Sequence, residues 1–162
     1  MKIWKFGDNV NTDLIIPGRY ALTTDARRLA KAAFIECRPE FTKEVREGDV
    51  IVAEENFGCG SSRETAPLAL KSAGITAIIA KSFGRIFFRN AINIGLIVLV
   101  CNEAEEIDET DDIELSLTKG EIKNLTKGST IKTDKLPNFV MEIVNSGGLV
   151  NYLKENGGKY AL

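Results

Sequence analysis

The segment 57–66, Phe-Gly-Cys-Gly-Ser-Ser-Arg-Glu-Thr-Ala, brings together side chains suited to binding an acid. Its two glycines let the backbone turn sharply and approach a ligand closely. Ser61, Ser62 and Arg63 follow at the expected start of a helix, where unpaired amides and the helix dipole favour anions. A guanidinium also grips a carboxylate with two parallel hydrogen bonds. The segment therefore predicts a site for a carboxylic acid.

The same residues also fit a purely structural role. Ser61 and Glu64 have the spacing of a capping box, in which the serine accepts a bond from the Glu64 amide and the glutamate reaches back. Both interpretations stay open, because a serine held by a helix can still present its oxygen to a ligand. A P-loop is excluded, since no Gly-Lys-Ser/Thr follows the glycines.

Histidine is absent from the chain, so no resident imidazole serves as general base or metal ligand. Cys37, Cys59 and Cys101 are far apart and form no Cys-x-x-Cys pair, which argues against a zinc ribbon or a self-contained iron–sulfur motif. Cys101 ends an apolar run and is expected in the core. Cys59 lies in a turn that favours a thiolate, but it has no histidine as base. The acidic run 103–112 is expected to be a solvated loop rather than a metal site.

The chain has 162 residues, of which 44% are hydrophobic, and a formal net charge of −2. This length and composition predict one domain, 1–162, with a sizeable core. Neither the net charge nor any basic tract favours nucleic acid as a partner. The apolar runs near 75–80 and 94–101 are too short to span a bilayer, and the N-terminus lacks the apolar region of a signal peptide. We therefore expect a cytoplasmic protein without a membrane partner.

The elements that must position segment 57–66 alternate between strand and helix, which indicates an α/β fold with a parallel sheet. In such a sheet, ligands bind beyond the carboxyl ends of the strands, an edge that would hold residues 58–63 and 82–85. Strands are expected at 3–6, 50–54, 75–80 and 96–100, and helices at 25–36 (capped by Asp25), 62–73 (ended by Gly74) and 82–93 (capped by Ser82, ended by Gly95). The remaining expectations are a polar turn at 8–13, a loop at 37–41, a hairpin at 113–117 and 122–125, and helices at 138–145 and 149–155.

Three separated segments carry a family resemblance. They are 7–17 (Gly-Asp-Asn-Val-Asn-Thr-Asp-Leu-Ile-Ile-Pro), 55–64 (Glu-Asn-Phe-Gly-Cys-Gly-Ser-Ser-Arg-Glu) and 80–83 (Ala-Lys-Ser-Phe). Over nearly its whole length the chain resembles the small subunits of 3-isopropylmalate dehydratase and of the related homoaconitase, in the aconitase superfamily. The resemblance implies a single swivel domain made as a separate polypeptide, with a central, partly parallel β sheet or barrel and flanking helices.

The same resemblance implies a hydro-lyase that works only with a large subunit, as a heterodimer or heterotetramer. The large subunit would hold a four-iron, four-sulfur cluster through its own cysteines, so this chain would bind no cofactor and no metal, and in isolation it would be free to self-associate. The implied reaction moves a hydroxyl between adjacent carbons of a small di- or tricarboxylate by dehydration and rehydration. With isopropylmalate, this is the second step of leucine biosynthesis.

By this resemblance, Ser61 matches the serine that takes the carbon-bound proton of the substrate. Ser62 and Arg63 match residues that bind a substrate carboxylate, and the helix start and Arg63 would together stabilise a Ser61 alkoxide. Asp13 and Gly60 are expected to support the site. Asp13 would either hold a side chain of the partner or stabilise its own turn.

Residues 20–23, Tyr-Ala-Leu-Thr, match a loop that senses the side group of the substrate, so Tyr20, Leu22 and Thr23 join the predicted binding residues. Archaeal-type relatives carry Arg at the position of Leu22. An apolar Leu22 beside Thr23 suits a branched alkyl group better than a further carboxylate, so isopropylmalate is the expected substrate. Homocitrate or homoaconitate remains an alternative. A stand-alone anion-binding module that uses residues 60–63 is a second alternative, from another class of protein.

Overall fold

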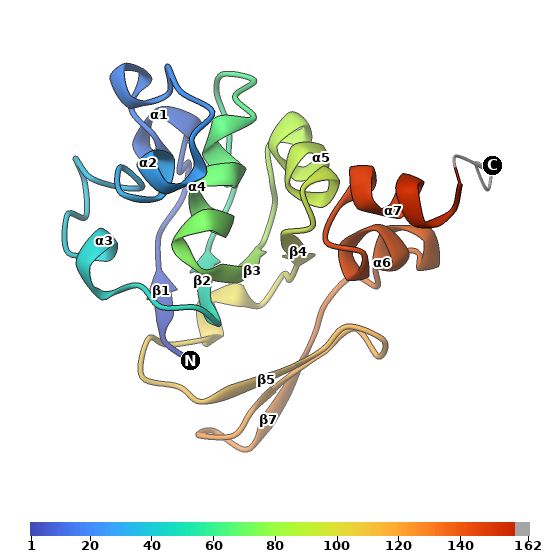
Figure 1. Cartoon of the computed structure of the whole chain (residues 1–162). Helices are drawn as coiled ribbons and strands as arrows, with labels where there is room; N and C mark the ends of the chain where they lie inside the picture. The colour runs from blue at the N-terminus through green and yellow to red at the C-terminus, as the bar shows by residue number, and fades with distance from the viewer. Residues whose placement is uncertain (158–162) are drawn as a thin grey trace.

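Four apolar strands form a parallel sheet at the centre of the structure (Figure 1). The structure is a computed structural model that describes residues 1–157; residues 158–162, the last of the expected domain 1–162, lie outside the described residues. The strands are β1 (Ile3–Lys5), β2 (Asp49–Ala53), β3 (Ile75–Ala80) and β4 (Ile97–Val100), and they lie in the order β1-β2-β3-β4. The predicted parallel sheet and α/β fold class are confirmed.

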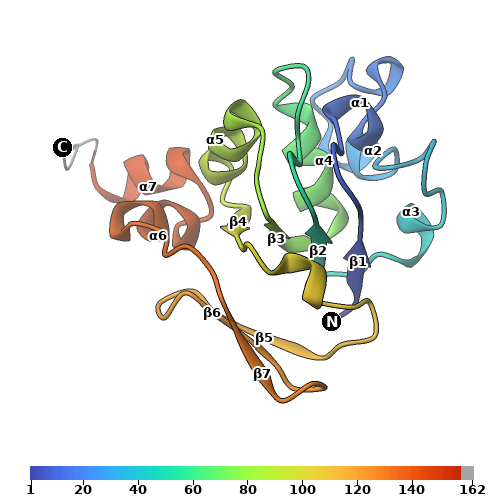
Figure 2. The same ribbon diagram turned by 180° about the vertical axis from the view of Figure 1, so that it is seen from behind.

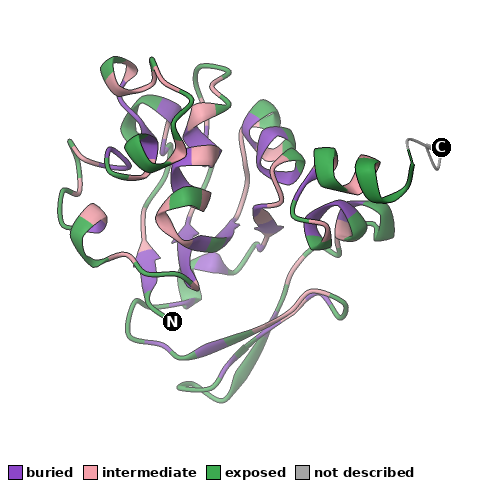
Figure 3. Cartoon of the chain, in the orientation of Figure 1, coloured by how far each residue is buried: buried purple, intermediate pink, exposed green. Residues whose placement is uncertain are grey.

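Side chains that alternate along these strands belong to two separate hydrophobic cores. Ile51, Ile78 and Val98 belong to the core on the helical side of the sheet, whereas Val50 and Ile79 belong to the core on its other side. Because successive side chains of a strand point to opposite faces, a sheet that is covered on both faces reads as a continuous apolar run. Figure 3 accordingly shows the strands of this sheet as buried.

The second core lies between the parallel sheet and a three-stranded antiparallel sheet (Figure 2). That sheet consists of β5 (Ile113–Ser116), β6 (Glu121–Asn124) and β7 (Ser129–Lys132). It buries one isoleucine from each strand, namely Ile113, Ile122 and Ile131. The predicted hairpin is confirmed, but β7 was not predicted, because only one of its four side chains is buried and no alternation is visible. The fold therefore has three layers: helices, a parallel sheet and an antiparallel sheet.

The helices are α1 (Thr12–Ile15), α2 (Ala26–Ala30), α3 (Phe41–Glu44), α4 (Thr65–Ala73), α5 (Arg85–Asn93), α6 (Asn138–Asn145) and α7 (Leu149–Glu155), with 3₁₀ turns η1 (Gly18–Tyr20) and η2 (Ala104–Glu106). The predictions for α6 and α7 are confirmed. Gly74, at φ +110°, ends α4 as predicted. Gly95, at φ +75°, directly follows Ile94, the C-cap residue of α5. The first core packs α4 and α5 against the sheet through Leu70, Phe87 and Ala91.

The N-terminal region departs from the sequence prediction. Asp25 caps α2 by accepting bonds from two backbone amides, but the helix expected over 25–36 ends at Ala30. Phe34 adopts a left-handed φ of +54°, and its amide donates to the Ile15 carbonyl at 2.8 Å instead of to a helical partner. The expected turn 8–13 contains the start of α1, which Asn11 caps. The last residue of the expected loop 37–41, Phe41, is the first residue of α3.

Two helix starts also differ from the prediction. The helix expected from residue 62 begins at Thr65, and the helix expected from residue 82 begins at Arg85. The Ser82 hydroxyl does not cap α5. It accepts a bond from the Asn56 amide at 2.8 Å and contacts the Glu55 carboxylate, so it braces the loop that follows β2.

The acidic run 103–112 is mostly exposed, as expected, and its carboxylates pair with cations from elsewhere in the chain. Asp111 is the exception, because it is buried and accepts bonds from the Asp108 amide and the Asn124 carboxamide. Cys101 is in the second core, as predicted, and burial raises the pKa of its thiol. Over residues 1–157, the helices are all too short or too polar for a membrane span.

Candidate active site

Three loops meet beyond the carboxyl ends of β1, β2 and β3. The Gly58 amide donates to the Val10 carbonyl at 2.7 Å, and the Thr12 amide donates to the Cys59 carbonyl at 2.9 Å. On the other side, the Gly84 amide donates to the Phe57 carbonyl at 2.8 Å. The predicted gathering of 58–63 and 82–85 at this edge is confirmed, and Figure 1 shows the loop at the top of the fold, between α1 and α5.

Close packing fixes this loop against α5. Gly58 has φ +75°, and a Cβ atom built on it would lie 2.2 Å from Cγ of Phe87. A Cβ on Gly84 would lie 2.5 Å from the Gly58 carbonyl oxygen. Only glycine combines the left-handed φ with this close approach, so the sequence places the loop before Ser61 with little freedom.

Ser61 is exposed and lines a cavity of about 310 Å³ together with Cys59, Gly60, Arg85 and Ile86. Its carbonyl accepts bonds from the Thr12 hydroxyl at 3.1 Å and from the Arg63 amide at 2.9 Å, and these two bonds hold the backbone in place. Thr12 is almost fully buried and was not among the predicted site residues. Its position inside Asn-Thr-Asp, next to the predicted Asp13, was the available signal.

The capping box predicted for Ser61 and Glu64 is wrong. Glu64 occupies the N-cap position of α4, and no side chain caps that helix. Ser61 lies outside α4, four residues before its first residue, Thr65. The bond from the Thr12 hydroxyl to the Ser61 carbonyl holds the backbone there. The helix that borders the cavity of Ser61 is α5, whose N-terminal residues Gly84, Arg85 and Ile86 line it. The positive end of a helix dipole thus borders this cavity, but it belongs to α5 and not to α4.

Arg63 bridges two of the loops. Its Nη1 donates to Oδ1 of Asp13 at 2.5 Å and to the Ile16 carbonyl at 3.3 Å, and its side chain is 28% exposed. Both bonds use Nη1, and within residues 1–157 the other guanidinium donors make no hydrogen bond. Asp13 therefore pairs within this chain, and it lies in the first turn of α1, which Asn11 caps. Arg63 and Ser62 line a second cavity, of about 550 Å³, with Leu22, Arg89 and Asn90.

Leu22 connects this second cavity to a third. It is 89% exposed and lines both the cavity of Arg63 and one of about 280 Å³ that contains Tyr20, Thr23 and Arg28. The Thr23 hydroxyl accepts a bond from the Asp25 amide, so it serves the start of α2. The structure thus brings Ser62, Arg63 and Leu22 together. It places Tyr20 and Thr23 in the neighbouring cavity, and Ser61 and Gly60 in the one described above.

Arginines dominate the charge of this edge, since Arg63 and Arg89 line one cavity, Arg85 the next and Arg28 the third. Arg85 and Arg89 come from the start and middle of α5, and both are exposed. All three cysteines are free thiols, and Cys59 is half-buried beside Ser61. Within residues 1–157, no three His, Cys, Asp or Glu side chains are grouped so that they would hold a metal ion.

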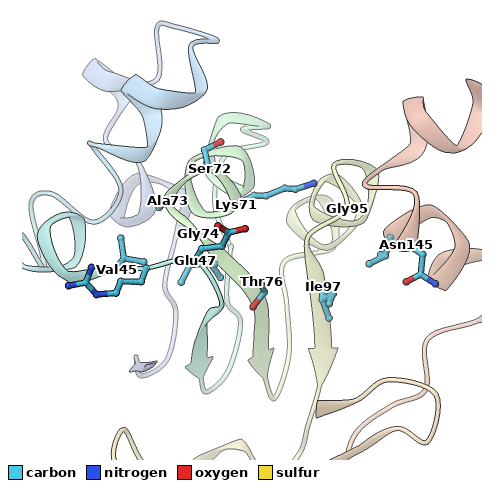
Figure 4. A pocket seen from close by; sticks show the side chains of 13 residues that line it. Val45, Glu47, Lys71, Ser72, Ala73, Gly74, Thr76, Gly95, Ile97 and Asn145 are labelled. Carbon is cyan, nitrogen blue, oxygen red and sulfur yellow. The ribbon is translucent and has the colours of Figure 1, made fainter. Parts of the chain in front are cut away.

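A larger cavity, of about 680 Å³, lies at the opposite end of α4 (Figure 4). Lys71 borders it, and its Nζ donates to the carbonyls of Ile94 and Gly147 at the ends of α5 and α6. Burial lowers the pKa of Lys71. This lysine bonds carbonyls at two helix ends, where carbonyls lack helical partners, so its role is structural. The predicted site lies at the other end of α4.

Comparison with known proteins gives one consistent family. Residues 10–104 match the model of the aconitase C-terminal domain. The chain is 54% identical over 154 residues to the 3-isopropylmalate dehydratase small subunit of Methanosarcina acetivorans, with 95% of each chain covered. It belongs to the 3-isopropylmalate dehydratase small-subunit family. The resemblance stated from the sequence is therefore confirmed.

Two further relatives agree with this family. One is 53% identical, over 95% of this chain and 92% of its own length, and is the isopropylmalate/citramalate isomerase small subunit of Methanocaldococcus jannaschii. The other is a crystal structure of 3-isopropylmalate dehydratase from the same organism, with a TM-score of 0.91, 52% identity, and coverage of 96% of this chain and 93% of the other. The three-layer α/β arrangement is thus the fold of the family.

Proposed function

We propose that this chain is the small subunit of an enzyme that interconverts 2-isopropylmalate and 3-isopropylmalate by dehydration and rehydration, in leucine biosynthesis. One observation carries the proposal: in a chain of this family, one loop at the carboxyl edge of the sheet carries an exposed serine, Ser61, which lines one cavity, and Arg63, which lines a second one. A hydroxyl and cations without histidine suit proton transfer next to a bound carboxylate.

Ser61 is assigned as the base that takes the proton from the substrate carbon. A neutral hydroxyl is a weak base, so its alkoxide needs stabilisation by positive charge. Arg85 and the N-terminus of α5 border the same cavity, and both become more effective once water is excluded. Gly60 supports the site because its φ of +88° sets the turn into Ser61.

Ser62 and Arg63 are assigned to a substrate carboxylate, with Asp13 and the Ile16 carbonyl orienting the guanidinium through Nη1. Leu22 lines the same cavity and would contact the branched alkyl group. Tyr20 and Thr23 shape the loop that carries Leu22. This arrangement supports isopropylmalate over homocitrate, because Leu22 offers no charge for a third carboxylate.

The four-iron, four-sulfur cluster of such enzymes supplies Lewis-acid chemistry, and we assign it to a large subunit. The described residues do not fit it, since Cys59 and Cys101 lie in different parts of the fold and Cys37 is isolated on the surface. We propose that residues 1–162 act as one swivel domain that closes over the large subunit, in a heterodimer or heterotetramer, in the cytoplasm. An isolated chain would bind small acids and remain inactive.

The test is turnover by the chain mixed with its large subunit, with Ser61→Ala as the variant. We expect the wild-type pair to convert isopropylmalate, and the variant to bind the large subunit normally while losing about 10²–10⁴-fold in kcat, the usual contribution of a general base. Ser72→Ala is the matched control, because Ser72 is exposed at the far end of α4.

Three results would contradict the proposal. Full turnover by Ser61→Ala would show that Ser61 is not the base. A clear preference for homocitrate would show that the enzyme is of the homoaconitase type. A chain that binds acids but never gains activity with a large subunit is a stand-alone binding module. Mass measurement of the complex gives its stoichiometry, and the same measurement on the isolated chain tests self-association.

A further inference from the structure

Two arginines from different elements line one cavity. Arg63 comes from the loop before α4 and Arg89 from the middle of α5, and both border the 550 Å³ cavity. Arg63 is already paired with Asp13. Arg89 is exposed, and none of the ion pairs found within residues 1–157 includes it. Like charges that share a cavity repel each other, so an anion between them would be favourable.

Two polar side chains, those of Thr65 and Asn90, also line this cavity. The hydroxyl oxygen of Thr65, at the start of α4, is buried and has no hydrogen-bond partner among the described residues. Asn90 follows Arg89, lines the same cavity and is only 8% exposed. A buried polar group without a partner costs about 1–3 kcal/mol, and such groups in a native fold commonly mark a bound water or ion.

Among residues 1–157, the exposed Glu64 is the only acidic residue that lines this cavity. The lining therefore carries two guanidinium groups against one solvated carboxylate. Leu22 and Ala21 supply apolar surface at the mouth. Cations at two walls with an apolar rim suit a ligand that has two acidic groups and one alkyl branch.

We propose that Arg89, with Asn90 and Thr65, forms a second carboxylate subsite, so that a dicarboxylate is held between Arg63 and Arg89. The inference rests on the proposed function and adds a binding residue to it. Arg63 takes one carboxylate and Arg89 takes the other. The Thr65 hydroxyl and the Asn90 carboxamide donate to the second carboxylate, while the alkyl branch lies against Leu22.

The test uses the complex with the large subunit and the variant Arg89→Gln. Loss of one charge-assisted contact is expected to raise KM for isopropylmalate about 10- to 100-fold while kcat changes little. Arg89→Lys should recover part of the loss. Arg27→Gln is the matched control, because Arg27 is exposed on α2 and lines none of the three cavities described above.

A second measurement separates a carboxylate subsite from a loss of folding or docking. The probes are 2-isopropylsuccinate, a diacid that lacks the reacting hydroxyl, and 4-methylpentanoate, which lacks one carboxylate. The inhibition constant of the diacid should rise about 10- to 100-fold in the Arg89→Gln complex. The inhibition constant of the monoacid should not change. Thermal melting of the variant should match that of Arg27→Gln.

Unchanged KM and unchanged diacid inhibition in Arg89→Gln would overturn the proposal. So would equal weakening of both inhibitors, or weaker assembly with the large subunit at unchanged inhibition, which would make Arg89 a docking contact. These outcomes differ from failure of the proposed function, in which the wild-type pair does not turn over isopropylmalate. In that case, calorimetric titration of the isolated chain with 2-isopropylsuccinate still tests the subsite.

Discussion

Replacing Gly58 with alanine tests whether packing against α5 fixes the loop that carries Ser61. The new Cβ would lie 2.2 Å from Cγ of Phe87 and 2.6 Å from its Cβ. Phe87 is 2% exposed and packs edge-on against Phe57, with 5.4 Å between ring centroids. The ring therefore has no free direction in which to move, and the loop itself must shift.

The expected loss of stability follows from two contributions. Overpacking of a buried site costs about 1–3 kcal/mol, and a left-handed φ adds roughly 1–2 kcal/mol for a residue with a Cβ. The sum is about 2–5 kcal/mol in the free energy of unfolding, which for a chain of this size lowers Tm by about 5–15 °C. Because the displaced loop leads into Ser61, turnover in the complex should fall as well.

The assay is urea unfolding of Gly58→Ala beside Gly128→Ala. Gly128 has φ +65°, and a Cβ at this position would have no atom within 4 Å, so it measures the backbone contribution alone, about 1–2 kcal/mol. Gly58→Ala should exceed it by about 1–3 kcal/mol. Phe87→Ala in the same chain should remove only the part of that excess that comes from the ring, because the Cβ of residue 87, 2.6 Å away, remains. Equal destabilisation by the two glycine variants would refute the packing argument.

Two further predictions concern carboxylates. Asp13→Ala should change the free energy of unfolding by less than about 1 kcal/mol, because the ion pair of Asp13 with Arg63 is partly exposed. It should raise KM for isopropylmalate on the order of tenfold, because the guanidinium loses its orientation. A shift in kcat alone would contradict this. Burial raises the pKa of Asp111, but bonds from the Asp108 amide, Asn124 and Lys127 outweigh it and lower the pKa overall. A lowered pKa stabilises the fold above the unfolded value of about 3.9, so the stability advantage over Asp111→Asn should be present at pH 7 and disappear in urea titrations as pH falls below about 4; a constant difference across that range would contradict it.

Local sequence rules predicted the parallel sheet because its strands obey them. Ile78 and Ile79 face opposite cores, so the strand is a largely apolar run, rich in β-branched residues, between Gly74 and Ser82. The carboxyl-edge placement of 58–63 followed from the order of elements alone. The helix ends were less predictable, because long-range contacts decided them. Phe34 leaves the helix to bond the Ile15 carbonyl, a partner that no spacing rule identifies.

The site shows the same division. Residue types within 57–66 indicated a carboxylate site, since Ser61, Ser62 and Arg63 are adjacent in sequence. The contacts that hold them are 47–50 residues away, from the Thr12 hydroxyl to the Ser61 carbonyl and from Arg63 to Asp13 and Ile16. Arg89 lines the same cavity as Arg63 because α5 packs beside α4. Such pairings depend on tertiary structure and leave no periodic signal in one sequence.

The exposure of these arginines explains why a chain with this site would need a second surface. Two unit charges about 4 Å apart attract by about 1 kcal/mol in bulk water and by about 4 kcal/mol near a protein surface of lower effective dielectric. Arg85 and Arg89 lie open to solvent, so in the isolated chain we expect them to bind acids weakly and to stabilise the proposed Ser61 alkoxide poorly. A partner that covers this edge excludes water and strengthens every one of these interactions at once. Activity should therefore appear with closure, while weak acid binding should remain in the isolated chain.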